Sequence, residues 1–168
     1  MVSMLKADLQ AMQIFRNLGS DALDLLLPII EPVELPAGTK VFEQDAPTQY
    51  FYLLKKGEVS IQFRAEDGQT IQVTTIQPGG IFGWSAALCR DCYTSAALTL
   101  SDCSAYRIIG RELQRFCQQH PDAGNLILES LSSEVSNRLY NTHDQVMHLL
   151  QQRFDASMRS LRQGESHG

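Results

Sequence analysis

The sequence has little of what metal-dependent enzymes, nucleic-acid-binding proteins and membrane proteins require. Its four histidines all lie at or after residue 120, and it has no apolar run near the roughly 20 residues of a membrane span. Acidic residues outnumber basic ones by 19 to 14, for a formal net charge of −5, whereas nucleic-acid-binding proteins usually carry a basic surface. The first residues lack the apolar core of a secretory signal, so we expect none. We therefore expect a cytoplasmic protein that binds neither nucleic acid nor a membrane.

Cysteine is also scarce, which argues against a disulfide framework or a metal centre. The four cysteines lie at positions 89, 92, 103 and 117, and only the first two form a close pair. No histidine lies in residues 33–109, and no paired carboxylates or Ser/His/Asp arrangement stands out. We expect buried, reduced thiols, no metal and no enzymatic activity.

The spacing of apolar residues predicts helices, then strands, then helices. Leu5, Leu9 and Met12 recur at helical spacing near the N-terminus. Short strands separated by turns follow over residues 33–109, and Asp67-Gly68 is a strong hairpin signal. We therefore expect an α+β fold in which residues 1–120 form an antiparallel β-barrel, jelly-roll-like (a double-stranded β-helix), with short N-terminal helices.

A single long helix is predicted after Pro121, with apolar residues every three or four positions. About 35 residues of helix span about 50 Å, which is more than a domain of this size can cover. We expect a dimerisation helix over residues 121–162 that makes a homodimer, followed by a disordered tail over 163–168, although the helix folding back on its own barrel remains an alternative. The residues expected at the dimer interface are Leu131, Val135, Leu139, Val146 and Leu149.

A glycine-rich turn at residues 79–83 precedes the small-residue segment Ser85-Ala86-Ala87-Leu88. Glycine permits backbone conformations with positive φ and lets other groups approach closely. The free amides at the start of a helical turn attract anions. This stretch therefore predicts a site for a phosphate or a carboxylate.

The order of these segments resembles the cyclic nucleotide-binding domain family. Residues 34–43 are similar to the family's opening turn and strand, and residues 50–59 to a segment that ends in glycine and a strand. Residues 78–83 are similar to its turn into the phosphate-binding cassette. The resemblance covers residues 15–120 and implies a regulatory sensor domain, a small-molecule ligand and a C-terminal helix that dimerises.

Two positions depart from the family's cassette. Nucleotide-binding members place a glutamate for the ribose 2′-hydroxyl after a phenylalanine-glycine pair, but here Trp84 follows Phe82-Gly83. The arginine that neutralises the cyclic phosphate is replaced by Tyr93. Neutral donors and the nearby Arg90 would remain for a ligand. The ligand-binding residues that the resemblance implies are Phe82, Gly83, Trp84, Ser85, Ala86, Arg90, Tyr93, Thr94 and Ser95.

The resemblance implies a role in signal transduction, for which we consider two hypotheses. The first is a stand-alone ligand-sensing regulatory module whose non-standard cassette binds a cyclic nucleotide or another small anion. The second is a protein-protein interaction module whose vestigial pocket is filled by Trp84 and Tyr93, with another polypeptide as partner. A transcription regulator fragment is disfavoured, because about ten residues after Ser157 cannot form a helix-turn-helix domain.

Overall fold

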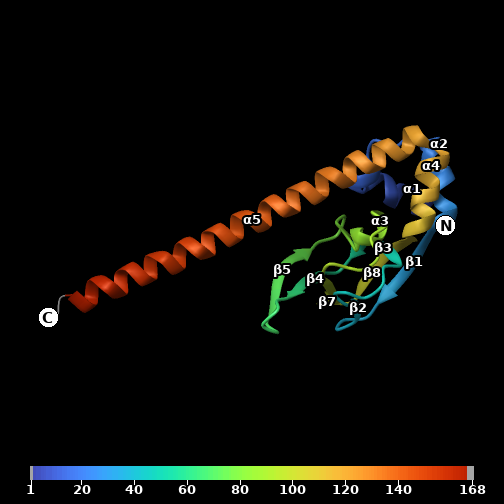
Figure 1. Cartoon of the computed structure of the whole chain (residues 1–168). Coiled ribbons are helices and arrows are strands. Elements are labelled where there is room, and N and C mark those ends of the chain that lie inside the picture. The colour runs from blue at the N-terminus through green and yellow to red at the C-terminus, as the bar shows by residue number, and fades with distance from the viewer. Residues whose placement is uncertain (1, 166–168) are drawn as a thin grey trace. The chain divides into compact units, whose positions relative to one another are not determined.

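The computed structural model describes residues 2–165 and divides the chain into a compact unit, Met1–Leu131, and a second unit, Ser132–Gly168 (Figure 1). The N-terminal elements are α1 (Val2–Ala11), the 3-10 helix η1 (Gln13–Phe15), α2 (Ser20–Leu26) and the 3-10 helix η2 (Leu27–Ile29). The strands are β1 (Ile30–Leu35), β2 (Lys40–Phe42), β3 (Tyr50–Lys56), β4 (Val59–Arg64), β5 (Thr70–Ile76), β6 (Ile81–Phe82), β7 (Ala96–Thr99) and β8 (Cys103–Ile109). The remaining helices are α3 (Trp84–Ala87), α4 (Gly110–Gln119) and α5 (Pro121–Glu165).

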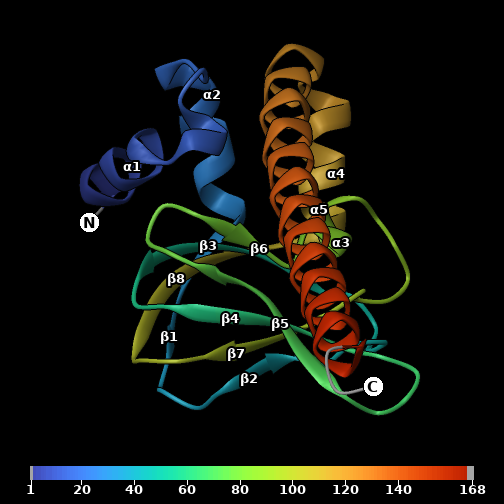
Figure 2. The ribbon, with the colours of Figure 1, turned by 90° about the vertical axis from the view of Figure 1, so that its left-hand side faces the viewer.

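The strands form two four-stranded sheets in the compact unit (Figure 2). One sheet has the order β1-β8-β3-β6 and the other β2-β7-β4-β5, and the paired strands run antiparallel. Strands distant in sequence are neighbours, since β8 lies between β1 and β3. The expected α+β fold with an antiparallel β-barrel and flanking helices is confirmed.

The hairpin of β4 and β5 is built around the predicted turn. Phe63 pairs with Ile71 across the two strands, and the amide of Ala65 donates to the carbonyl of Gln69 at 2.9 Å. Gly68 in this turn has φ 85°, a conformation that glycine adopts without steric cost. Local turn chemistry therefore sets the register of this hairpin.

Strand β3 is buried on both faces. Tyr52 and Leu54 belong to the core inside the barrel, whereas Phe51 and Leu53 alternate with them, and each is fully buried. Because successive side chains of a strand point to opposite faces, these two residues lie on the outer face of the sheet. The sheet thus separates two apolar layers, one inside the barrel and one outside it.

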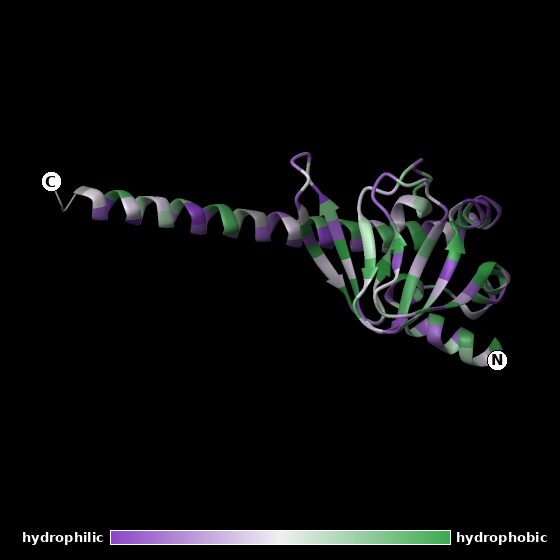
Figure 3. Cartoon of the chain, turned by 90° about the horizontal axis from the view of Figure 1, so that it is seen from below, coloured by the Kyte–Doolittle hydropathy of each residue, from purple (hydrophilic) through white to green (hydrophobic). Residues whose placement is uncertain are grey.

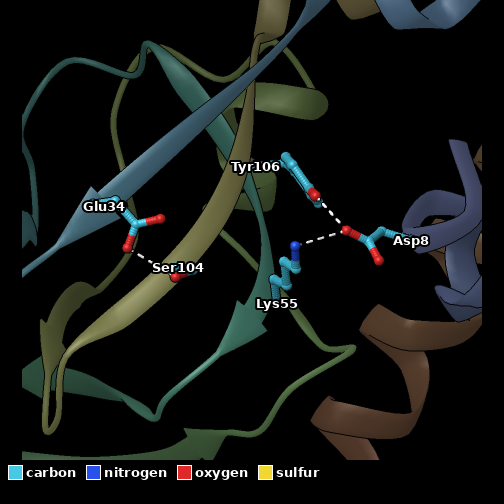
Figure 4. A network of polar contacts seen from close by, with 5 residues as sticks. All are labelled: Asp8, Glu34, Lys55, Ser104 and Tyr106. Carbon is cyan, nitrogen blue, oxygen red and sulfur yellow. Dashed lines mark hydrogen bonds and ion pairs between the residues drawn. The ribbon is translucent and has the colours of Figure 1, made fainter. Parts of the chain in front are cut away.

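A polar network ties α1 to the outer face of this sheet (Figure 4). The Asp8 carboxylate of α1 accepts a hydrogen bond from the Tyr106 hydroxyl at 2.6 Å and pairs with Lys55 Nζ at 2.8 Å. The bond from Lys55 is the main cause that lowers the pKa of Asp8, followed by the bond from Tyr106. Farther along the sheet, Ser104 donates to Glu34 at 2.8 Å. The network positions the first helix against β3 and β8.

Helix α5 begins at Pro121 and continues through Glu165. We expected a disordered tail from residue 163, but Gln163, Gly164 and Glu165 are helical, and residues 166–168 lie outside the described part. Apolar and polar bands alternate along this helix (Figure 3). Among the described residues, no helix is both long enough and apolar enough to cross a membrane.

Candidate functional site

The cassette region begins where β6 ends, at a glycine that the geometry requires. Gly83 has φ 72° and ψ 28°, in the left-handed region, and it precedes the first residue of α3. A Cβ atom at this position would lie 3.0 Å from the carbonyl oxygen of Tyr50 and 3.2 Å from the rings of Phe42 and Tyr52. Both the conformation and the close approach therefore favour glycine.

Helix α3 is a single turn that packs inward. Ser85 and Ala86 are buried, whereas Trp84 is half-buried. The amide of Ala86 donates to the carbonyl of Gly83 at 3.1 Å, and the amide of Arg90 donates to the carbonyl of Ser85 at 2.9 Å. The Ala86 amide, one of the groups we expected to face an anion, is thus already bonded within the turn.

Tyr93 lies inside the barrel, only 4% exposed. Its ring stacks on Phe42 with 3.8 Å between centroids and 10° between planes. Its hydroxyl donates to the carbonyl of Tyr50 at 2.8 Å and accepts from the amides of Tyr50 at 3.0 Å and Gln49 at 3.2 Å. The phenol is therefore held by one aromatic ring and three hydrogen bonds to the start of β3.

The space around Tyr93 is filled by aromatic rings. Tyr52 and Phe82 stack with 4.8 Å between centroids, and Phe42 lies 6.3 Å from Phe82. Burial raises the pKa of Tyr52 to about 12, and the neighbouring Tyr93 adds to this rise. The Tyr52 phenol is therefore neutral, and stacked, mutually packed rings fill this part of the interior.

Arg107 is a cation near this cluster that sequence analysis missed. It lies on β8 opposite Tyr52 of β3 and Glu31 of β1, and it shares the inward face of β8 with Ala105. Its Nε donates to Glu31 at 3.0 Å, and its guanidinium lies 4.1 Å from the centroid of the Tyr50 ring. The alternation of residues in β8 could have indicated that Arg107 points inward. It could not have indicated that Glu31 bonds its Nε.

The predicted ligand-binding residues fall into three groups by exposure. Phe82, Ser85, Ala86 and Tyr93 are buried; Gly83, Trp84 and Ser95 are half-buried; Arg90 and Thr94 are exposed. The predicted dimer residues also differ, because Leu131 is buried within the compact unit and Val135 is half-buried, whereas Leu139 and Leu149 are exposed. The side chain of Val146 lies outside the described residues.

The cysteines correct one expectation. Cys103 is buried, but Cys89 and Cys92 are exposed, so the prediction of buried thiols is wrong for this pair. They follow the turn of α3, where the chain comes to the surface, and Cys89 adopts φ 55° there. Within residues 2–165, no group of three or more histidine, cysteine, aspartate or glutamate side chains is placed to hold a metal ion.

Comparisons with known proteins agree with this architecture. The family model of the cyclic nucleotide-binding domain matches residues 32–120. A CRP-like cAMP-activated global transcriptional regulator from Mycobacterium tuberculosis is 27% identical over 137 residues, which are 82% of this chain and 59% of that protein. This chain thus spans less than two thirds of the length of that relative.

Two solved structures share the fold. A cyclic nucleotide-binding domain from Methylobacillus flagellatus superposes with a TM-score of 0.76 at 14% identity, covering 87% of this chain and 82% of the other. The catabolite activator protein of Thermus thermophilus superposes with a TM-score of 0.68 at 22% identity, covering 82% and 62%. Because the family model covers more than half of the sequence, the chain belongs to the cyclic nucleotide-binding domain family, and the two solved structures share its fold.

Proposed function

We propose that this sensor domain is a regulatory module with a non-standard cassette, which does not hold the phosphate of a cyclic nucleotide through a buried charge. The observation that carries this proposal is Tyr93. Its ring stacks on Phe42, and its hydroxyl is occupied by three hydrogen bonds. A phosphate entering here would meet a neutral phenol.

The cost of the missing charge can be estimated. A hydrogen bond to a charged group contributes about 1.5–3 kcal/mol, so its absence weakens phosphate binding tenfold or more. Arg107 is the other cation beside these rings, but its Nε already bonds Glu31, so holding a phosphate would require it to share or give up that partner. A cyclic nucleotide would also have to displace or bypass the stacked rings of Tyr93 and Phe42, which stabilise the interior of the barrel.

The single tryptophan provides the test, because Trp84 begins α3 at the cassette. We expect the fluorescence of the wild-type protein to show no saturable change when cyclic AMP or cyclic GMP is added below millimolar concentration. Saturable binding at micromolar concentration would contradict the proposal.

A variant designed to bind cyclic nucleotides more tightly tests whether the missing charge is the cause of weak binding. Trp84→Glu combined with Tyr93→Arg supplies a hydroxyl acceptor and a phosphate partner, and we expect at least tenfold tighter binding of a cyclic nucleotide by calorimetry. The matched control is Trp84→Glu with Tyr93→Phe, which lacks the new cation. Circular dichroism establishes that both variants fold. If the folded arginine variant binds no better than its control, the missing charge is not the cause.

We further propose that this module acts as a homodimer through α5. Beyond Ser132 the helix exposes many large apolar side chains, and four of them recur every seven residues. This is the period of a coiled-coil seam, and an apolar stripe without a partner favours aggregation. Tyr140, Met147, Phe154 and Leu161 form this heptad stripe, which was not among the predicted dimer residues.

A further inference from the structure

A cavity of about 430 Å³ lies behind the cassette, at the junction of three segments of the compact unit. Its walls come from residues 47–49 before β3, from the chain between Ala86 and Asp91, and from the junction of β8 and α4. Its volume falls within the usual range of small-molecule sites, about 300–1,000 Å³. Tyr93 and the rings stacked around it are not among its lining residues, so it differs from the barrel interior.

Two arginines line this cavity from different elements. Arg90 follows α3 and Arg111 belongs to the first turn of α4. Within the described residues, neither guanidinium makes a hydrogen bond or an ion pair with a protein side chain. Asp91 also lines the cavity, so these three residues carry a formal charge of about +1 by their ordinary ionisation. The cavity is thus locally cationic in a chain of net charge −5.

The walls are held in place by hydrogen bonds between segments. The amide of Thr48 donates to the carbonyl of Asp91 at 3.0 Å, and its hydroxyl donates to the carbonyl of Arg90. The amide of Gly110 donates to the carbonyl of Gln49 at 3.0 Å. A site that exists before its ligand arrives avoids the cost of ordering loops on binding.

The remaining lining residues suit a small polar organic molecule. Gln49 and Gln114 contribute amide groups that can both donate and accept, and Ile109 contributes an apolar wall. The planar fork of a guanidinium matches the oxygens of a phosphate in a bidentate geometry. We propose that this cavity binds an organic phosphate, a small phosphorylated metabolite whose phosphate group is held by Arg90 and Arg111.

Calorimetry with defined probes tests this site. We expect glycerol 3-phosphate to bind the wild-type protein and inorganic phosphate to compete with it, whereas citrate competes poorly. Arg90→Gln and Arg111→Gln should each weaken glycerol 3-phosphate binding at least tenfold, the loss of about one charge-assisted bond. Arg64→Gln is the matched control, because Arg64 is an exposed arginine of β4 outside the cavity, and it should leave binding unchanged.

Three results would overturn the proposal: no binding of either phosphate at millimolar concentration, equal losses in Arg64→Gln and the two cavity variants, or preferential binding of citrate. If Arg111→Gln does not fold, Arg111→Lys replaces it; this variant keeps the charge but lacks the fork, and it should still weaken binding.

Discussion

The compact unit buries most of its large apolar residues, whereas the helical unit after it exposes them. Phe51 and Phe82 of the first are fully buried, whereas Phe154 of the second is 66% exposed and Leu139 is 62% exposed. Burying such a side chain contributes about 1.5–3 kcal/mol. The first unit therefore completes a core with its own residues, while the second carries apolar surface that only another surface can bury.

The largest expected effect is the loss of dimer association when an exposed apolar residue of α5 is replaced by a charged one. If the stripe of α5 pairs with a second copy, Phe154→Asp removes two buried rings from each dimer and should cost about 3–6 kcal/mol of association free energy. Leu139→Asp should act in the same direction. We expect sedimentation to show a dimer for the wild type at micromolar concentration and a monomer for Phe154→Asp.

Gln152→Asp serves as the control for the helix, because Gln152 is exposed and lies on the opposite side of α5 from the heptad stripe. This variant should remain dimeric. A monomeric wild-type protein at micromolar concentration would show that the exposed stripe has another role.

The next prediction compares the effect of a glycine-to-alanine substitution on the free energy of unfolding in each of the two units. A Cβ atom at Gly110 would lie 2.2 Å from the carbonyl oxygen of Ala86, because α4 begins in contact with α3, whereas one at Gly164 of α5 would meet nothing within 4 Å. Gly110→Ala should therefore lower the free energy of unfolding by about 3 kcal/mol. Gly164→Ala should not lower it, since alanine favours a helix. Urea unfolding measures both, and equal effects would contradict the close contact of α3 and α4.

A smaller effect is expected from a single hydroxyl. Tyr93→Phe keeps the ring on Phe42 but leaves the Tyr50 carbonyl and the amides of Gln49 and Tyr50 without their partner. We expect a loss of about 1–3 kcal/mol in the free energy of unfolding. Tyr140→Phe, at a site 70% exposed on α5, should change little. If the two variants unfold alike, the hydroxyl of Tyr93 is not a structural group.

The smallest effect concerns the ion pair of α1. Bonds from Lys55 and Tyr106 lower the pKa of Asp8 in the folded protein, so the carboxylate contributes stability above its unfolded pKa, about 4, and loses it as pH falls through the lower folded value. The difference in stability between wild type and Asp8→Asn should therefore shrink as the pH falls below about 4. Tyr106→Phe removes one of the two bonds to Asp8. Its stability in thermal unfolding should therefore depend less on pH in this range than the stability of the wild type does. A difference that grows at low pH would refute this assignment.

Several features of the fold follow from residues near each other in sequence. Asp67-Gly68 predicts the hairpin because a tight turn depends on a few neighbouring backbone angles. Asp45 adopts φ 67°, as expected for a residue type that tolerates the left-handed region. Short strands are predicted over residues 33–109, and β8, the last strand of the structure, ends at Ile109. These predictions succeed because the interactions behind them are local.

The interior of the cassette was harder to predict. Sequence analysis named Tyr93 as a replacement for a cation, but its stacking on Phe42 and its bonds to Tyr50 join residues more than forty positions apart. Arg107 reaches the same region because β8 lies between β1 and β3. No spacing in the sequence encodes that neighbourhood, because strand order is settled by how the sheets close around their core.

By itself, the sequence determined the order of helices and strands, the turns between them and the long C-terminal helix with its regularly spaced apolar residues. Tertiary structure decided which groups meet. It filled the barrel beside α3 with aromatic rings, paired Arg107 with Glu31, and brought Arg90 and Arg111 to one cavity, where neither guanidinium pairs with a side chain of the described residues. The physical reason is range: turns and periodicity depend on neighbouring residues, whereas burial and charge pairing depend on contacts between segments that only the folded chain brings together.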